Sequence, residues 1–137
     1  MMTIWRAAVV LALLVGQVPS EKDTRSPAQQ KISSQLLYEI YRARGEATAK
    51  QVPPDPTLVR LDRKKRALVD IRADVTTALQ KTIRAQGGTI ESVSTRYRSI
   101  IAWVPLLRLE RLAKERAVYS IEPKAEPARN AIDKHHS

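Results

Sequence analysis

The chain has 137 residues, no cysteine and a formal net charge of +10 at pH 7. This length leaves room for one domain with tails, and the lack of cysteine excludes a disulfide framework and thiol catalysis. The positive charge favours anionic partners such as nucleic acid, acidic lipid or wall polymer. Acidic residues are interspersed along the chain, so an ordinary solvated surface is the competing interpretation.

Residues 1–20 have the pattern of a signal peptide. Arg6 precedes an apolar stretch of nine residues, Ala7–Val15, and Val18-Pro19-Ser20 resembles a cleavage site. Nine residues are too few to cross a bilayer as a helix, so we expect no stable membrane insertion. Cleavage near Ser20 would leave a charge of 23 − 14 = +9 and a secreted or periplasmic protein. The alternative is an uncleaved N-terminal anchor.

Residues 21–57 are expected to form a linker that contains one helix, at about 27–44. Ser26 and Pro27 are a typical helix start, and Gly45 is a typical helix end. The apolar residues between them recur at helical spacing: Ile32, Leu36, Leu37, Ile40 and Tyr41. A helix this short needs a surface to pack on, which is either the rest of this domain or a partner protein.

A proline-rich stretch and a basic run follow this helix. The prolines at 53, 54 and 56 exclude a helix or a central strand there. The basic run consists of Arg60, Arg63, Lys64, Lys65 and Arg66. It could bind phosphates together with Arg96 and Arg98. The ring pairs that stack on RNA bases in other sheet proteins are missing, so nucleic acid is not an expected partner.

Residues 58–124 are expected to form the folded domain. Their pattern predicts strands at 66–72, 89–94, 98–104 and 118–122, and helices at 75–86 and from Pro105 onward. Asp74 is the expected cap of the first helix, and Gly87-Gly88 its end. The order βαββαβ predicts an α+β fold of the ferredoxin-like type, an open-faced sandwich with a four-stranded antiparallel sheet and two helices on one face. The helix near the N-terminus would be an addition to it.

The strand at 98–104 separates two faces of this sheet. Ile100, Ala102 and Val104 alternate toward the expected helices. The residues on the other side are Tyr97, Ser99, Ile101 and Trp103. Polar residues would be expected on an open face, so Ile101 and Trp103 indicate a docking surface. The alternative is that the helix containing residues 32–41, or a second copy of the chain, covers Trp103.

The residues needed for catalysis are missing from the predicted domain. The only histidines, His135 and His136, lie near the end of the chain, so a Ser/His/Asp triad is not expected. There is no Gly-rich phosphate loop and no set of ligands with metal spacing. We therefore expect a protein that is not an enzyme and that uses no cofactor and no metal. The polar residues 125–137 are expected to form a flexible tail.

The stretch from Leu68 to Lys124 resembles the propeptide domain of subtilisin-like serine proteases, which also occurs as a free-standing peptidase inhibitor. The similar segments are LVDIRA, the helix ending in QGG, TIESVS, YRSIIAWVP and LLRLERLAKERAVYSIEP. Tyr97 falls at the aromatic position that precedes the alternating core residues of that family. The sequence of this stretch is also similar to the N-terminal regions of large secreted bacterial subtilisin-like proteins.

This resemblance implies a binding role, as an inhibitor or folding assistant of a subtilisin-like serine protease. In that family the open sheet face packs on two surface helices of the protease, and the tail after the last strand enters the active site like a product. By position, the protease-binding face would be Tyr97, Ile101 and Trp103. The product-like tail would be Lys124, Ala125, Glu126, Pro127, Ala128, Arg129 and Asn130.

Two features of this chain depart from the family pattern. The family tends to carry an acidic side chain near the central hairpin, where this chain has Arg96 and Arg98, and it often has Glu-Pro-Asp where this chain has Glu122-Pro123-Lys124. The protease could be bound in trans, or in cis in a longer precursor of which this chain is a remnant. The rival interpretation is a structural module whose basic surface binds envelope polymers.

Overall fold

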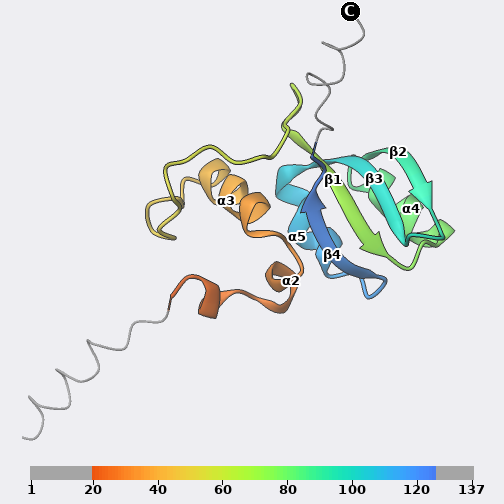
Figure 1. Cartoon of the computed structure of the whole chain (residues 1–137), viewed down its shortest axis with the longest axis horizontal. Coiled ribbons are helices and arrows are strands. Elements are labelled where there is room, and N and C mark those ends of the chain that lie inside the picture. The colour runs from red at the N-terminus through yellow and green to blue at the C-terminus, as the bar shows by residue number, and fades with distance from the viewer. Residues whose placement is uncertain (1–19, 126–137) are drawn as a thin grey trace, which may run out of the picture.

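Four strands form one antiparallel sheet in the computed structural model, which describes residues 20–125 (Figure 1). The strands are β1 (Arg66–Ala73), β2 (Thr89–Ser94), β3 (Ser99–Pro105) and β4 (Val118–Pro123). Their order across the sheet is β2-β3-β1-β4, and each neighbouring pair is antiparallel. This order confirms the predicted α+β class and the ferredoxin-like βαββαβ arrangement.

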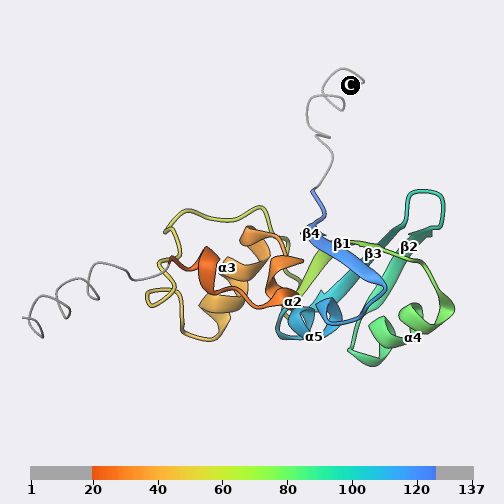
Figure 2. The ribbon, with the colours of Figure 1, turned by 90° about the horizontal axis from the view of Figure 1, so that it is seen from below.

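Two helices, α4 (Thr77–Ala85) and α5 (Leu109–Ala113), lie together on one face of the sheet (Figure 2). The side chains of β3 alternate as predicted. Ile100, Ala102 and Val104 are fully buried in the core, whereas Ile101 and Trp103 are half-buried. The buried residues that the helices contribute are Leu79, Ile83, Leu109, Leu112 and Ala113.

The first helix of the βαββαβ unit begins later than predicted, and Asp74 is not its cap. The hydroxyl of Thr76 accepts a hydrogen bond from the Leu79 amide at 3.0 Å, so Thr76 is the N-cap. Asp74 lies before the helix, and its amide donates to the Ala117 carbonyl at 2.8 Å. The carboxylate of Asp74 accepts instead from the hydroxyl of Tyr119. The predicted helix end is confirmed, since Gly87 has a φ of 89°.

The second helix also begins later than predicted. Pro105 is the last residue of β3, where it pairs with Arg66, and it does not open an α-helix. The Leu106 amide donates to the Lys65 carbonyl at 3.1 Å, which fixes the chain at this point. A 3-10 turn, η2 (Leu106–Arg108), then leads into α5.

The single helix predicted at 27–44 is divided in two. A 3-10 turn, η1 (Lys22–Thr24), precedes α2 (Pro27–Gln30), and α3 (Ser34–Ala43) follows after a break. In the break, the Ser33 amide donates to the Ile121 carbonyl at 2.9 Å and the Ile121 amide donates to the Lys31 carbonyl at 2.8 Å. Residues 31–33 thus pair in parallel with the outer edge of β4, so their polar groups are used in the sheet and not in a helix.

The helix α3 shares one core with the sheet. Its buried side chains are Leu36, Leu37, Ile40 and Tyr41, and they belong to the same apolar cluster as β1, β3 and the two helices. Figure 2 shows α3 beside the β4 edge of the sheet. Of the two partners expected for this helix, its own domain is therefore the one observed. Gly45, with a φ of 73°, ends it as predicted.

The proline-rich segment after α3 is fastened by one arginine. Arg42 Nη2 donates to the carbonyls of Pro53 and Asp55, at 2.7 Å and 2.9 Å. Arg42 is also paired with Glu39 at 2.8 Å, and Glu39 in turn accepts from the hydroxyl of Thr57. Backbone groups that prolines leave without strand partners are thereby satisfied. Within residues 20–125 no helix is both long and apolar enough to span a bilayer.

Candidate functional site

The face of the sheet opposite α4 and α5 is the candidate binding face. The register of β1 and β3 places Leu68 opposite Trp103, Asp70 opposite Ile101, and Arg72 opposite Ser99. Apolar residues therefore gather at the end where β1 begins, and polar residues gather at the end where β1 finishes. The two ends differ in what they could bind.

The apolar end of the face is built around Trp103. The indole Nε1 donates to Glu91 Oε1 at 2.6 Å, and the Arg60 guanidinium lies over the ring, 5.5 Å from its centroid. Glu91 is in position because the register of β2 shifts between Ile90 and Ser92, which makes it the extra residue of a β-bulge. The ring is therefore oriented before any partner arrives.

Leu68 connects this end to two other segments of the chain. Its amide donates to the Arg60 carbonyl at 3.1 Å, and its carbonyl accepts from the Lys124 amide at 3.0 Å. The first bond holds Arg60 beside Trp103. The second places the start of the C-terminal segment at the same end of the face. Neither α3 nor a second copy is needed to explain why Trp103 is half-buried, because Arg60 already lies over it.

The polar end of the face is a closed set of hydrogen bonds. Ser99 Oγ donates to Asp70 Oδ1 at 2.7 Å, and Arg72 Nη2 lies 3.0 Å from Asp70 Oδ2. Arg72 Nη1 also donates to the carbonyl of Tyr97 at 3.2 Å. These polar groups are already hydrogen-bonded to one another. This end therefore has fewer groups available to a partner than the apolar end.

Tyr97 lies outside β3, in the turn between β2 and β3. Its side chain is 64% exposed, and the Arg96 guanidinium lies 5.4 Å from its ring centroid. Ile101 and Trp103 are brought together on the open face, but Tyr97 is at the opposite end of the sheet from Trp103. Arg98 in the same turn has a φ of 51°, which breaks the alternation that the sequence suggested.

Lys124 and Ala125 are the only residues of the expected product-like tail that the structure describes. The others lie outside the described residues: Glu126, Pro127, Ala128, Arg129 and Asn130. The expected signal peptide, apart from Ser20, also lies outside them. Lys124 continues from Pro123 at the end of β4, next to Leu68.

The sequence did not single out Leu68, Glu91 and Arg60 as parts of this face. Leu68 had a usable signal, because it alternates with Asp70 and Arg72 on the side of β1 opposite the core residues. Glu91 and Arg60 had none, since a bulge and a long-range stacking contact depend on the folded chain.

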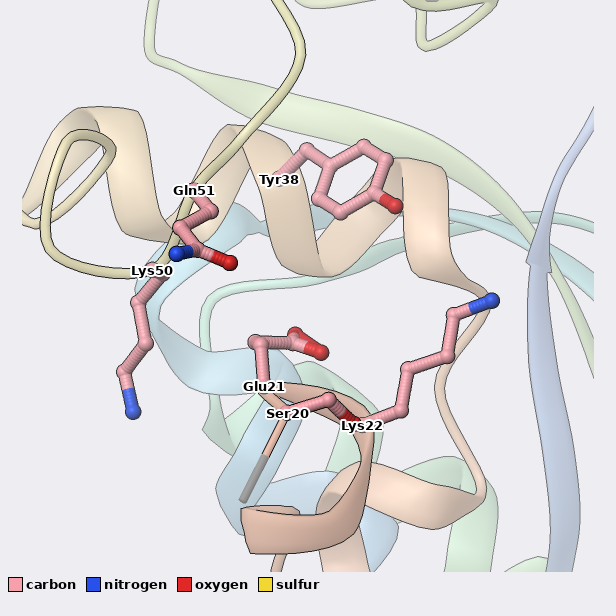
Figure 3. A pocket seen from close by; sticks show the side chains of 6 residues that line it. All are labelled: Ser20, Glu21, Lys22, Tyr38, Lys50 and Gln51. Atoms are coloured by element: carbon pink, nitrogen blue, oxygen red, sulfur yellow. The ribbon is translucent and has the colours of Figure 1, made fainter. Parts of the chain in front are cut away.

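A second concave site lies between the N-terminal segment and α3. The hollow has a volume of about 190 Å³ and is lined by Ser20, Glu21, Lys22, Tyr38, Lys50 and Gln51 (Figure 3). The Glu21 carboxylate is already bound by Arg25 at 3.0 Å. Behind the hollow, burial and then a hydrogen bond to Glu21 raise the pKa of Tyr41 to about 12. These contacts attach the N-terminal segment to the rest of the fold. They leave few polar groups with which a ligand could form hydrogen bonds.

Neither site contains the groups of a metal centre or a catalytic triad. Among residues 20–125 no cluster of three or more His, Cys, Asp or Glu side chains could hold a metal ion. The two histidines of the chain lie beyond Ala125. The open face carries the half-buried side chains of Ile101 and Trp103 beside the hydrogen-bonded groups of Asp70, Arg72 and Ser99. Comparison of the chain with protein-family models, with curated proteins and with solved structures found no match.

Proposed function

We propose that this chain is a secreted, non-catalytic binding protein that inhibits a subtilisin-like serine protease or assists its folding. The observation that supports the proposal is the position of Lys124. It leaves β4 beside Leu68, at the same end of the open face as Trp103. A partner that packs on this face would therefore receive the following residues, Ala125–Asn130, directly at its own surface.

The apolar end of the face has the character of an interface centre. A large aromatic side chain in such a position commonly contributes about 2 kcal/mol or more to binding. Trp103 is held by Glu91 on one side and by Arg60 on the other. The Trp103 side chain would then lose little conformational freedom when a partner binds. Such preorganisation strengthens association.

The remaining groups of the face would form its rim. Asp70, Arg72 and Ser99 already satisfy one another, so they can stay solvated when a partner binds at the apolar end. Rim groups of this kind exclude water from the interface centre and add little affinity themselves. Inhibition should accordingly depend on Trp103 and Ile101 far more than on Arg72.

The test is inhibition of a panel of subtilisin-like proteases by the chain from Glu21 to Ser137, together with refolding of the same proteases lacking their own propeptides. Trp103→Ala should weaken inhibition roughly 30-fold, which corresponds to about 2 kcal/mol, and should leave the melting temperature nearly unchanged. A chain ending at Pro123 should lose inhibition as well. Failure of the parent chain to inhibit or to refold any of them would refute the proposal.

A matched control is Leu58→Ala. Leu58 is 70% exposed, and its amide donates to Gln35 Oε1 of α3. The Leu58→Ala variant should leave inhibition unchanged. If Trp103→Ala lowers the melting temperature and leaves inhibition intact, Trp103 is a structural residue and the open face is not the binding face.

A further inference from the structure

A tight hairpin precedes β1 and presents a basic tip. Leu61 pairs with Ala67 across it. The carboxylate of Asp62 accepts from the amides of Lys64 and Arg66, at 2.9 Å and 2.8 Å, and from Arg66 Nε at 2.8 Å. The tip residues at 63, 64 and 65 are all exposed, and Lys65 has a φ of 58°. The turn is therefore fixed in shape while its cationic side chains remain in solvent.

An apolar hollow lies directly beside this tip. Its volume is about 210 Å³, and it is lined by Ala43, Lys64, Lys65, Pro105, Leu106 and Leu107. The Leu106 amide donates to the Lys65 carbonyl at 3.1 Å, which joins η2 to the hairpin. Leu107 is 53% exposed at its border. Two ammonium groups and an exposed leucine thus share one small surface.

The positive charge of this surface is not neutralised within the fold. The nearby carboxylates are already engaged, Asp62 by Arg66 at 2.8 Å and Glu110 by Arg44 at 2.8 Å. Burial alone would raise the pKa of Asp62, but the hydrogen bonds from Arg66 and Lys64 outweigh it and lower that pKa. Among the cations of the hairpin tip and η2, Arg63, Lys64, Lys65 and Arg108 form no ion pair with any residue in the range 20–125.

We propose that this surface, the basic–leucine corner formed by Arg63, Lys64, Lys65, Leu107 and Arg108, binds the anionic surface of a phospholipid membrane. Each basic residue close to an anionic leaflet raises the affinity about fivefold. The proposal goes beyond the protease-binding role and does not depend on it, since the corner lies at the hairpin and η2 and not on the open face.

The exposed leucine decides between a membrane and a soluble polyanion. A hydrophilic polymer such as a wall polymer or a nucleic acid gains nothing from Leu107. A membrane interface accepts an apolar side chain below the headgroups while flanking lysines stay at headgroup level. The corner also has no aromatic ring among the residues that line it, so stacking on bases has no platform there.

The test measures sedimentation of the full chain with vesicles of phosphatidylglycerol and phosphatidylcholine in equal amounts, against vesicles of phosphatidylcholine alone. The readout is the ratio of the two affinities, so contributions that are equal on both kinds of vesicle cancel. The parent should prefer the anionic vesicles, and the preference should fall as salt rises from low to physiological concentration. The double variant Lys64→Glu, Lys65→Glu should lower the ratio more than 20-fold.

The matched control is Lys81→Glu with Lys114→Glu, which changes the net charge equally at exposed positions outside the corner. It should lose far less of the preference. Equal losses in both double variants would show that net charge, and not the corner, determines binding, and this would overturn the proposal. A parent that binds both kinds of vesicle equally, or neither, would overturn it too.

A second variant separates lipid from soluble polyanion. Leu107→Ala should weaken binding to the anionic vesicles about tenfold, because less apolar surface enters the interface, and should leave binding to inorganic polyphosphate unchanged. If it leaves vesicle binding unchanged and the parent binds polyphosphate as tightly as vesicles, the partner is a soluble polyanion and the membrane assignment is wrong. Circular dichroism of each variant confirms that it is folded.

Discussion

The two faces of β3 carry similar residue types but differ in what surrounds them. Ile100, on one face, is fully buried among side chains from the helices and from β1. Ile101 and Trp103, on the other face, are half-buried, and Trp103 is held by the side chains of Arg60 and Glu91. One strand therefore supplies folding stability from one side and, in the function that we propose, a recognition surface from the other. Mutations that alternate along β3 should alternate in effect.

The largest expected difference is between Ile100→Ala and Ile101→Ala. Truncating a fully buried isoleucine typically costs about 2–5 kcal/mol, which is a large share of the stability of a small domain. Ile100→Ala should therefore unfold the protein or nearly so in thermal melts followed by circular dichroism. Ile101→Ala should melt close to the parent. Equal melting temperatures for the two variants would abolish the distinction between the faces.

A pH titration tests the contribution of Tyr41, a buried residue of α3, to the stability of the core. Burial and Glu21 raise the pKa of Tyr41 to about 12 from the 10 of a free tyrosine, so the folded protein holds this proton more tightly than the unfolded chain. The resulting stability is complete below pH 10 and is lost as pH rises to about 12; its size is at most about 3 kcal/mol. Urea unfolding between pH 9 and 12 measures it.

The variant Tyr41→Phe is the control for this titration. It removes the hydroxyl and keeps the ring that fills the core, so the fall in stability between pH 10 and 12 should become shallower. A variant with the same pH profile as the parent would show that another group causes the alkaline unfolding.

A smaller effect separates two candidate caps of α4, the helix that covers the core face. Thr76→Ala should cost about 1 kcal/mol, because the Leu79 amide loses its hydrogen-bond partner. Asp74→Ala should remove the contact with Tyr119 and leave the helix start intact. Amide exchange at Leu79 should accelerate only in the Thr76 variant. The opposite result would restore Asp74 as the cap.

The strands were predictable because their signals are local. In β3 every second residue is an apolar core residue, and in β1 the run of Leu68, Val69 and Ile71 marks a buried strand without any knowledge of its neighbours. The helix starts were predicted less well. Asp74 and Thr76 are both good caps, and only the bond from the Asp74 amide to the Ala117 carbonyl decides between them.

The candidate face was predicted in part for the same reason. Ile101 and Trp103 follow from alternation alone, whereas Arg60 reaches Trp103 only because a hairpin turns the chain back along β1. The division of the N-terminal helix was also beyond local pattern. Residues 31–33 continue a helical apolar spacing, but they pair with Ile121, and no nearby residue indicates that contact.

That pairing between Ile32 and Ile121 has a consequence for when the molecule can fold. The two residues are 121 − 32 = 89 positions apart, so the contact belongs to the long-range kind that slows folding. A chain that emerges with its N-terminus first exposes α3 long before β4 exists to receive it. The apolar side of α3 therefore stays exposed to solvent until nearly all of the described chain has emerged. We therefore expect folding to be completed only when β4 is present. A chain that stops before Val118 should stay unfolded and be susceptible to proteolysis.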